Sequence, residues 1–197
     1  NGKYIGFYGV DNPPAAYMNN TSVLINMMEF VISMMIRLRD YAKVVERSAT
    51  HDQLTNCKNR RAMQWVYDTE FDKEQSMMVV MCDLNGLKKI NDLQGHLEGD
   101  AVLKKTAYLI NECFPRKAYR FGGDEFVVLS IGIKESNFIK QVEQSKKYLE
   151  QNGISCSVGV SWCYNINDVD ELIKEADTKM YENKANFYEN EMVGIES

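Results

Sequence analysis

The sequence predicts an α/β fold in which helices flank a mixed central β-sheet, with one long helix ahead of it. Stretches of helical and strand character alternate through most of the chain, as in layered α/β domains. The continuous apolar run Met77-Met-Val-Val-Met-Cys82 is typical of a strand buried on both faces of a sheet. Gly122-Gly123, between strand-like segments at 118–121 and 126–131, indicates a two-residue hairpin and therefore an antiparallel strand pair.

The composition is that of an ordinary globular chain. Of 197 residues, 45% are hydrophobic and 26% are charged, which excludes a disordered chain, a collagen and a disulfide-stapled miniprotein. The net charge is −5 and there is no basic run, so nucleic acid is not expected as a partner. Five cysteines without a Cys-x-x-Cys motif favour buried, reduced thiols and a cytoplasmic location.

The remaining elements follow from periodicity and from punctuating residues. Residues 4–10 have strand character, and Pro13-Pro14 ends that strand. Thr21 and Ser22 are candidate N-caps of a helix that reaches about Thr50. Further helices are expected at 58–71, 87–93, 101–113, 137–151 and 168–184, and a last strand at 154–162.

The long helix carries apolar residues at alternating steps of three and four, which is a heptad pattern. These residues are Leu24, Met27, Val31, Met34, Leu38, Tyr41 and Val45. We expect a homodimer through this helix, and the alternative is a single amphipathic helix that lies on its own domain. The most apolar part, 23–36, is interrupted by Asn26, Glu29 and Ser33, and we expect it to be too short to span a bilayer.

Acidic residues stand where two expected strands end. Asp83 follows the apolar run, and Asp124 and Glu125 follow Gly122-Gly123. Taken singly, Asp83 could cap a helix and the other two could lie in a solvated turn. If the two strands are neighbours, however, Asp83 and Asp124 can share a cation. Oxygen ligands without His or Cys favour Mg²⁺ or Mn²⁺.

The segment after Asp83 suits a nucleotide. Its turn opens a helix near Gly86, and free N–H groups at a helix start bind phosphate. Lys88 and Lys184 could neutralise phosphate charge, although a surface lysine is by default only solvated. Asn91 and Asp100 offer the donors and acceptors that a guanine edge requires. The alternative role of Asp100 is that of an N-cap.

Five segments stand in an order that resembles the GGDEF family, the diguanylate cyclases. They are Asp52-Gln-Leu-Thr55, Asn59-Arg60-Arg61, Asp83-Leu-Asn-Gly-Leu-Lys-Lys-Ile-Asn-Asp92, Gly95-His-Leu-Glu-Gly-Asp100 and Arg120-Phe-Gly-Gly-Asp-Glu-Phe126. The resemblance covers about residues 48–187. It implies a nucleotidyl-cyclase-like palm in which two GTP molecules, one on each of two facing domains, condense to cyclic di-GMP with release of pyrophosphate.

The resemblance also implies roles for single residues. Asp83 and Asp124 would be metal ligands, together with the Leu84 carbonyl. Asp124 and Glu125 would be catalytic, with Asp124 nearest the attacking hydroxyl. Guanine would be read by Asn91 and Asp100, and phosphate would be held by Lys88, Lys184, Gly86 and Leu87.

Three departures from the family pattern stand out. Asn85 replaces a frequent Asp at a position that is not the first metal ligand, so activity should survive. Cys113-Phe-Pro-Arg116 occupies the place of the product-binding Arg-x-x-Asp, so product inhibition through that site is not expected. Residues 185–188 lack the usual Gly-Arg-Asn. A non-catalytic module that binds GTP or cyclic di-GMP is the alternative, and retention of the acidic residues argues against it.

The first residues carry a second, shorter resemblance. Gly6-Phe-Tyr-Gly-Val-Asp-Asn-Pro13, followed by a long apolar helix, resembles the closing strand and helix of a GAF sensor domain. The expected organisation is therefore a terminal piece of a GAF-like domain at 1–22, a coiled-coil linker at 23–50, a GGDEF domain at 51–187 and a tail at 188–197.

Overall fold

The computed structural model describes residues 18–69, 75–164 and 169–195. The chain divides into two units, residues 1–47 and residues 48–197. The expected strand at 4–10, and with it the GAF-like segment, lies outside the described residues.

The first unit consists of most of helix α1, Met18–Thr50. The helix begins ahead of Thr21 and Ser22, so these residues are not its N-caps as the sequence suggested. All seven heptad residues are exposed, with Val45 at 46% the least and Tyr41 at 69% the most accessible. Contrary to our expectation, residues 21–50 are long and apolar enough to cross a membrane by length and composition alone, with a mean hydropathy of 1.4 over 18 residues.

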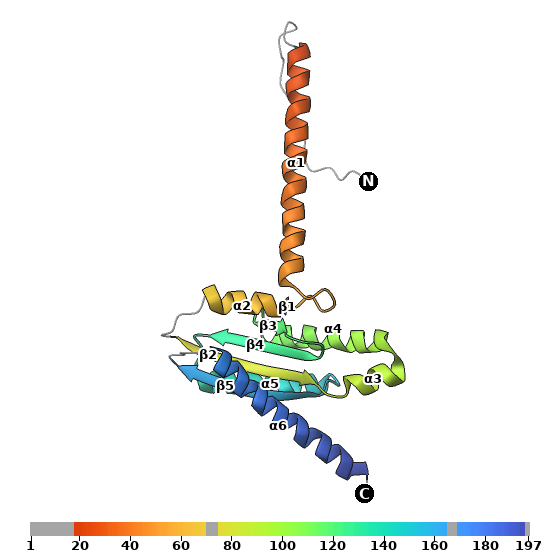
Figure 1. The fold of residues 1–197 in the computed structure, drawn as a ribbon, viewed down its shortest axis with the longest axis vertical. Coiled ribbons are helices and arrows are strands. Elements are labelled where there is room, and N and C mark those ends of the chain that lie inside the picture. Colours follow the sequence, from red (N-terminus) through yellow and green to blue (C-terminus); the bar gives the residue numbers. More distant parts are fainter. Residues whose placement is uncertain (1–17, 70–74, 165–168, 196–197) are drawn as a thin grey trace. The chain divides into compact units, whose positions relative to one another are not determined.

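The second unit is built on a five-stranded sheet of order β1-β3-β4-β2-β5 (Figure 1). Its strands are β1 Lys58–Asn59, β2 Ser76–Leu84, β3 Ala118–Arg120, β4 Glu125–Ile131 and β5 Cys156–Tyr164. β1 pairs with β3 in parallel, and the other neighbours are antiparallel. The predicted mixed sheet is therefore confirmed.

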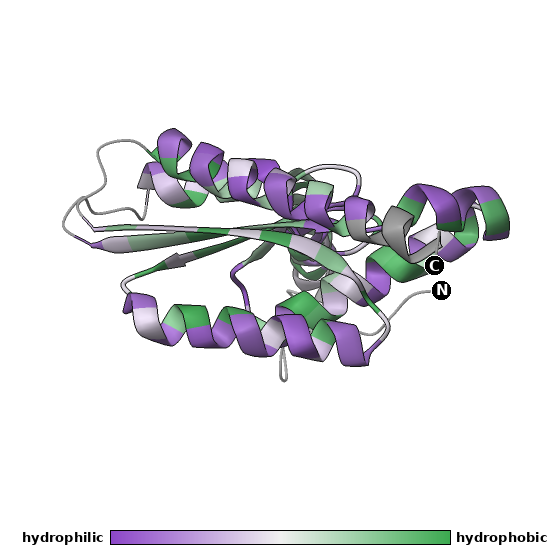
Figure 2. Ribbon diagram, turned by 90° about the horizontal axis from the view of Figure 1, so that it is seen from below, coloured by the Kyte–Doolittle hydropathy of each residue, from purple (hydrophilic) through white to green (hydrophobic). Residues whose placement is uncertain are grey.

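Strand β2 is buried on both faces, as its apolar run predicted, and its side chains alternate between two cores. Met78, Val80 and Cys82 pack in one core with helices α4 His96–Cys113 and α5 Glu135–Gln151. Met77, Val79 and Met81 pack in the other with α2 Arg60–Thr69 and α6 Val169–Ile195. Figure 2 shows the sheet between these two layers of helices.

Alternation continues into the polar end of the sheet. Side chains two residues apart on a strand lie on the same face. Asp83 follows Met81 by two residues and Glu125 precedes Val127 by two, so both acids belong to the face that α2 and α6 cover. Gly159 of β5 lets α6 approach this face closely, because a Cβ at that position would collide with the backbone of Ala176 and Met180.

Several boundaries differ from those predicted. Residues 58–59 form β1, so α2 begins only at Arg60. A short helix, α3 Leu87–Gln94, is followed at once by α4, which begins at His96 with Gly95 as its cap. Asp100 is therefore inside a helix and is not an N-cap. The hairpin between β3 and β4 contains four residues, 121–124, where two were expected. Helix α6 does not end near Lys184 but continues to Ile195.

Candidate nucleotide and metal site

Pairing of β2 with β4 places the three acidic residues together. Asp83 lies opposite Glu125 in the register, and the Leu84 N–H donates to the carbonyl of Asp124 at 3.1 Å. The neighbouring strands that the sequence argument required are therefore present. Asp124, at the end of the hairpin loop, is held by its backbone beside the last residues of β2.

Asp83 is a buried carboxylate with incomplete hydrogen bonding. It is 4% exposed, and Oδ2 accepts a hydrogen bond from Lys184 Nζ at 2.7 Å. Oδ1 is buried and has no partner among the described residues. Burial raises the pKa of the Asp83 carboxyl, Lys184 opposes this rise, and the charge of Asp124 adds to it.

Glu125 adds to the same concentration of negative charge. Burial and then the charges of Asp83 and Asp124 raise the pKa of its carboxyl. Its side chain lies against Gly122, where a Cβ would meet the Glu125 carboxylate. A carboxylate with a buried unpaired oxygen, beside two further acidic residues, forms an environment that a cation would stabilise.

Helix α6 contributes two polar side chains one turn apart. Met180 is buried against the sheet, and Lys184 and Tyr188 follow at intervals of four residues, so each lies next to the one before. Although partial burial acts to lower it, the hydrogen bond with Asp83 raises the pKa of Lys184. The Tyr188 hydroxyl accepts a hydrogen bond from the Gly86 N–H at 3.4 Å.

The start of α3 has the properties of a phosphate site. Gly86 has a φ of 74°, in the left-handed region that favours glycine, and no side chain caps the helix. The first turn, which includes Leu87 and the exposed Lys88, contains no acidic residue. Free N–H groups and a helix dipole without a competing carboxylate favour an anion here.

Asn85 anchors this turn to β5. Its side-chain oxygen accepts from the Ser157 hydroxyl at 2.8 Å and its amide nitrogen contacts the Ser155 hydroxyl at 3.1 Å. Because Asn85 is buried and directed toward these serines, it fixes the turn and is not turned toward Asp83.

The two expected guanine readers lie on adjacent helices. Asn91 is on α3, and its side-chain oxygen lies where a Cβ of Gly99 would be. Gly99 directly precedes Asp100 on α4, so the absence of a side chain there lets Asn91 approach the first turns of α4. Both residues are only partly buried, which leaves their polar atoms accessible to a base.

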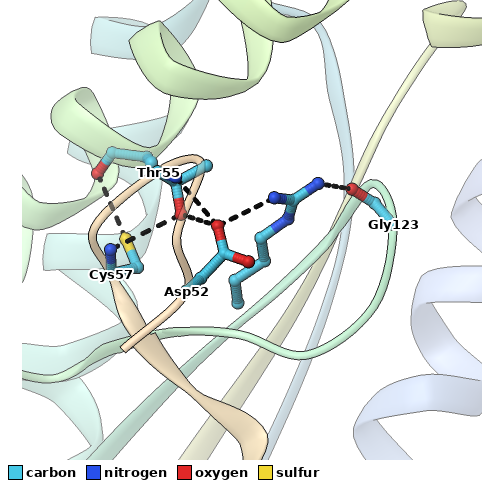
Figure 3. A network of polar contacts seen from close by, with 6 residues as sticks. Asp52, Thr55, Cys57 and Gly123 are labelled. Atoms are coloured by element: carbon cyan, nitrogen blue, oxygen red, sulfur yellow. Dashed lines mark hydrogen bonds and ion pairs between the residues drawn. The ribbon is translucent and has the colours of Figure 1, made fainter. Parts of the chain in front are cut away.

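A second polar cluster supports the hairpin loop from the other side. Asp52 Oδ1 accepts hydrogen bonds from the Thr55 N–H at 2.8 Å, the Thr55 hydroxyl at 2.7 Å and Arg120 at 2.8 Å. Arg120 also donates to the Gly123 carbonyl at 2.6 Å. Figure 3 shows Asp52 beside Thr55, with Gly123 at the far end of the network. The residue before Asp124 is thus fixed to the turn that follows α1.

Comparison with known proteins decides the family. The family model described as "Diguanylate cyclase, GGDEF domain" matches residues 49–189. The chain belongs to the GGDEF family. Its GGDEF domain therefore coincides with the second structural unit.

Several curated proteins are similar to this GGDEF domain. Diguanylate cyclase A of Treponema denticola is 27% identical over 180 residues, which cover 82% of this chain and 48% of that protein. Diguanylate cyclase DgcS of Shewanella oneidensis is 31% identical over 57% of this chain and 40% of its own length. The cyclic di-GMP phosphodiesterase PdeR of Escherichia coli is 33% identical over 68% of this chain and 22% of its own length. The chain thus spans less than half the length of these relatives.

A solved structure confirms the fold of the GGDEF domain with a preceding helix. This structure is the coiled coil and GGDEF domain of DgcB from Caulobacter crescentus in complex with c-di-GMP. It superimposes on this chain with a TM-score of 0.70 at 22% sequence identity. The superposition covers 83% of this chain and 95% of the DgcB chain.

Sequence reasoning missed two features of this GGDEF domain. Tyr188 escaped notice because α6 was expected to end near Lys184, although its spacing of four from Lys184 could have identified it. The bond between Asp52 and Arg120 joins residues 68 positions apart, which no local pattern reveals.

Proposed function

We propose that this chain is the catalytic domain of a diguanylate cyclase that condenses two GTP molecules into cyclic di-GMP. The ribose 3′-oxygen of each GTP forms a bond to the α-phosphorus of the other, the 3′-hydroxyl loses its proton, and pyrophosphate departs. The observation that carries the proposal is the buried Asp83, with one unpaired oxygen, beside Asp124 and the start of α3, which no side chain caps.

A divalent cation fits this donor set. Asp83 and Asp124 would hold it with the Leu84 carbonyl, and Mg²⁺ or Mn²⁺ prefers such oxygen ligands. Among the described residues no three His, Cys, Asp or Glu side chains form a metal-binding group, so phosphate oxygens of the nucleotide would complete the coordination. When bound, the cation neutralises phosphate charge and polarises the reacting phosphoryl group.

The residues of the chain have separable tasks. Asn91 and Asp100 read the guanine edge, and the N–H groups of Gly86 and Leu87, with Lys88, hold phosphate. Asp124 lies nearest the attacking hydroxyl and assists its deprotonation, and Glu125 lies near the cation. Lys184 balances the charge of Asp83 with a bond of 2.7 Å.

Each domain holds one GTP, so catalysis requires two copies that face each other. We propose that α1 forms this dimer as a coiled coil, because its heptad residues are exposed in the single chain, and a row of exposed apolar side chains is characteristic of an interface. The GAF-like sequence ahead of α1 suggests control by a sensor domain. Five free thiols support a cytoplasmic location.

The test is incubation of the concentrated chain with GTP and Mg²⁺, with products identified by mass spectrometry. We expect cyclic di-GMP and pyrophosphate, and neither from Asp124→Asn, a variant of nearly the same shape. Absence of product from a chain held as a dimer by an added leucine zipper, with GTP binding intact, would refute the cyclase.

That negative result would favour the alternative, a regulatory module that binds the nucleotide without turnover. The similarity to PdeR, a phosphodiesterase by name, is the observation on its side. Retention of Asp83, Asp124 and Glu125 supports the cyclase instead.

A further inference from the structure

A groove of about 460 Å³ lies beside strand β5, the last strand of the sheet, between helices α5 and α6. Apolar side chains line it, among them Phe138 of α5 and Val160 and Trp162 of β5. Charged side chains of the two helices line it as well: Glu143, Lys146, Glu175 and Lys179. None of these residues belongs to the candidate nucleotide site.

Strand β5 has the composition of an interior strand, although it lies at the edge of the sheet (Figure 1). Its nine residues, Cys156–Tyr164, include no charged residue and no proline, which are the usual protections of an exposed edge. Trp162 is 37% and Tyr164 is 58% exposed. A long, apolar edge of this kind is a template for pairing with another strand.

The backbone groups that face the open side of β5 are those of its even-numbered residues. In an antiparallel ladder, the N–H and C=O groups of successive residues point alternately to the two sides of the strand. The Ser155 carbonyl accepts from the Asn85 N–H, on the side of β2, whereas the Val160 carbonyl accepts from Lys179 Nζ at 3.1 Å, on the open side. Trp162 follows Val160 by two residues, so its N–H and C=O groups also face outward.

Lys179 protects this edge at one point only. It pairs with Glu175 at 2.6 Å and donates to the Val160 carbonyl, and a lysine that covers an edge strand is a common protection against pairing. In the described part of the chain, no loop or side chain forms a corresponding hydrogen bond with the backbone of Trp162. The edge is therefore open at Trp162.

The charges of the groove favour a second copy of this chain as the occupant. A groove with charges of one sign would select a partner of the opposite sign and would repel its own copy. Here α5 contributes both Glu143 and Lys146, so two copies related by a twofold axis can bring opposite charges together. Antiparallel pairing about such an axis is self-complementary, because both copies present the same strand.

We propose that β5 pairs in antiparallel orientation with β5 of a second copy and joins the two sheets edge to edge. A register centred on Trp162 places this residue opposite its own copy and Tyr164 opposite Val160. These are aromatic and aromatic–β-branched pairs, which stabilise neighbouring strands. The interface is separate from helix α1 and does not depend on the proposed cyclase activity.

The test is sedimentation equilibrium of the full chain over a range of concentrations. We expect the parent to have at least twice the mass of Trp162→Lys, because lysines on this edge repel each other across the twofold axis. The dissociation constant for this step should rise by about tenfold or more. The expected difference in mass is the same whether or not α1 forms a dimer, so failure of the α1 dimer leaves the test intact.

Two further variants make the mass comparison decisive. Tyr164→Lys, at a more exposed position of the same edge, should have the same effect, and it replaces Trp162→Lys if circular dichroism shows that variant to be unfolded. Trp65→Lys removes a tryptophan that is 60% exposed on α2, and as the matched control it should keep the mass of the parent.

Fluorescence places the contact at the edge itself. The chain has two tryptophans, so Trp65→Phe leaves Trp162 as the only one. On dilution its emission should move to longer wavelength in step with the fall in mass, because separation of the edges exposes the ring to water. Constant emission while the mass falls would overturn the proposal. Equal masses for the parent and the folded lysine variants would also overturn it and would leave the edge to a different partner.

Discussion

Two aspartates border the hairpin loop that carries Asp124, each paired with one basic residue, and their carboxylates are in opposite situations. Asp52 Oδ1 accepts three hydrogen bonds, two from Thr55 and one from Arg120. Asp83 accepts one, from Lys184, and its other oxygen is buried without a partner. Although partial burial acts to raise it, the bonds from Arg120 and Thr55 lower the pKa of Asp52, whereas burial raises that of Asp83.

The difference separates a structural acid from a functional one. A carboxylate that the protein satisfies fully stabilises the fold and needs nothing further. A buried carboxylate that is left partly unsatisfied and surrounded by negative charge weakens the fold in the absence of a ligand. Asp52 therefore belongs to the support of the loop, and Asp83 to the proposed nucleotide and metal site.

We expect the largest effect from Asp83→Asn, and we expect it on catalytic activity and not on stability. We expect cyclic di-GMP formation to fall by about 10²-fold or more, because charge stabilisation at the reacting phosphates is lost. Thermal stability without metal should change little, because removal of a buried and partly unsatisfied charge offsets the loss of the ion pair with Lys184. Product measurement by mass spectrometry and melting by circular dichroism test the two halves.

The matched control is Asp92→Asn, an exposed acid on α3, which should affect neither quantity. A clear loss of stability in metal-free Asp83→Asn would contradict the assignment of Asp83 as functional.

Asp52→Ala should show the reverse pattern. It removes three hydrogen bonds to a carboxylate, one of them from its ion-pair partner Arg120, and we expect a loss of about 1.5–3 kcal/mol in the free energy of unfolding. Chemical denaturation measures this loss. Asp68→Ala, at an exposed acid on α2, is the control and should change stability by less than about 0.5 kcal/mol.

A double-mutant cycle with Arg120→Ala sharpens this prediction. If Asp52 acts through Arg120, the two losses should not add. Full additivity would show that the pair is not coupled.

Tyr188→Phe should have a smaller effect, on substrate binding alone. The hydroxyl occupies the Gly86 N–H, where a phosphate oxygen would bind, so its removal should lower KM for GTP by about two- to tenfold. Steady-state kinetics should show kcat unchanged, and Tyr181→Phe, exposed on the same helix, should leave KM as it is. An increase in KM would mean that the hydroxyl contacts the substrate directly.

The sequence was sufficient for strands β2 to β5 and for the pairing of the acids, but not for the short edge strand β1, whose residues were expected to begin a helix. A continuous apolar run followed by Asp83 marks a central strand and its polar end, and Gly122-Gly123 marks the hairpin, so the meeting of Asp83 with Asp124 was predictable. The N-cap of α4 was not predictable from the sequence. Asp100 is a common N-cap type, but Gly95, with its φ of 89°, separates the two helices first. The support of the loop by Asp52 depends on tertiary contacts that no local pattern contains.

The pH dependence of stability should also distinguish Asp52 from Asp83, and we expect this effect to be the smallest of those predicted. The pKa of Asp52 is lowered from 3.8, so its contribution to stability is present above that value and is lost as the pH falls through the folded-state pKa. The stability difference between the parent and Asp52→Asn should therefore shrink in acid.

The pKa of Asp83 is raised from 3.8, so the protonated acid is the form that favours folding. That contribution is complete below 3.8 and is lost as the pH rises through the folded-state value. Relative to the parent, Asp83→Asn should thus gain stability with rising pH in that window. Denaturation at stepped pH with a chelator present measures both differences, and parallel curves for the two variants would show that the carboxylates do not differ.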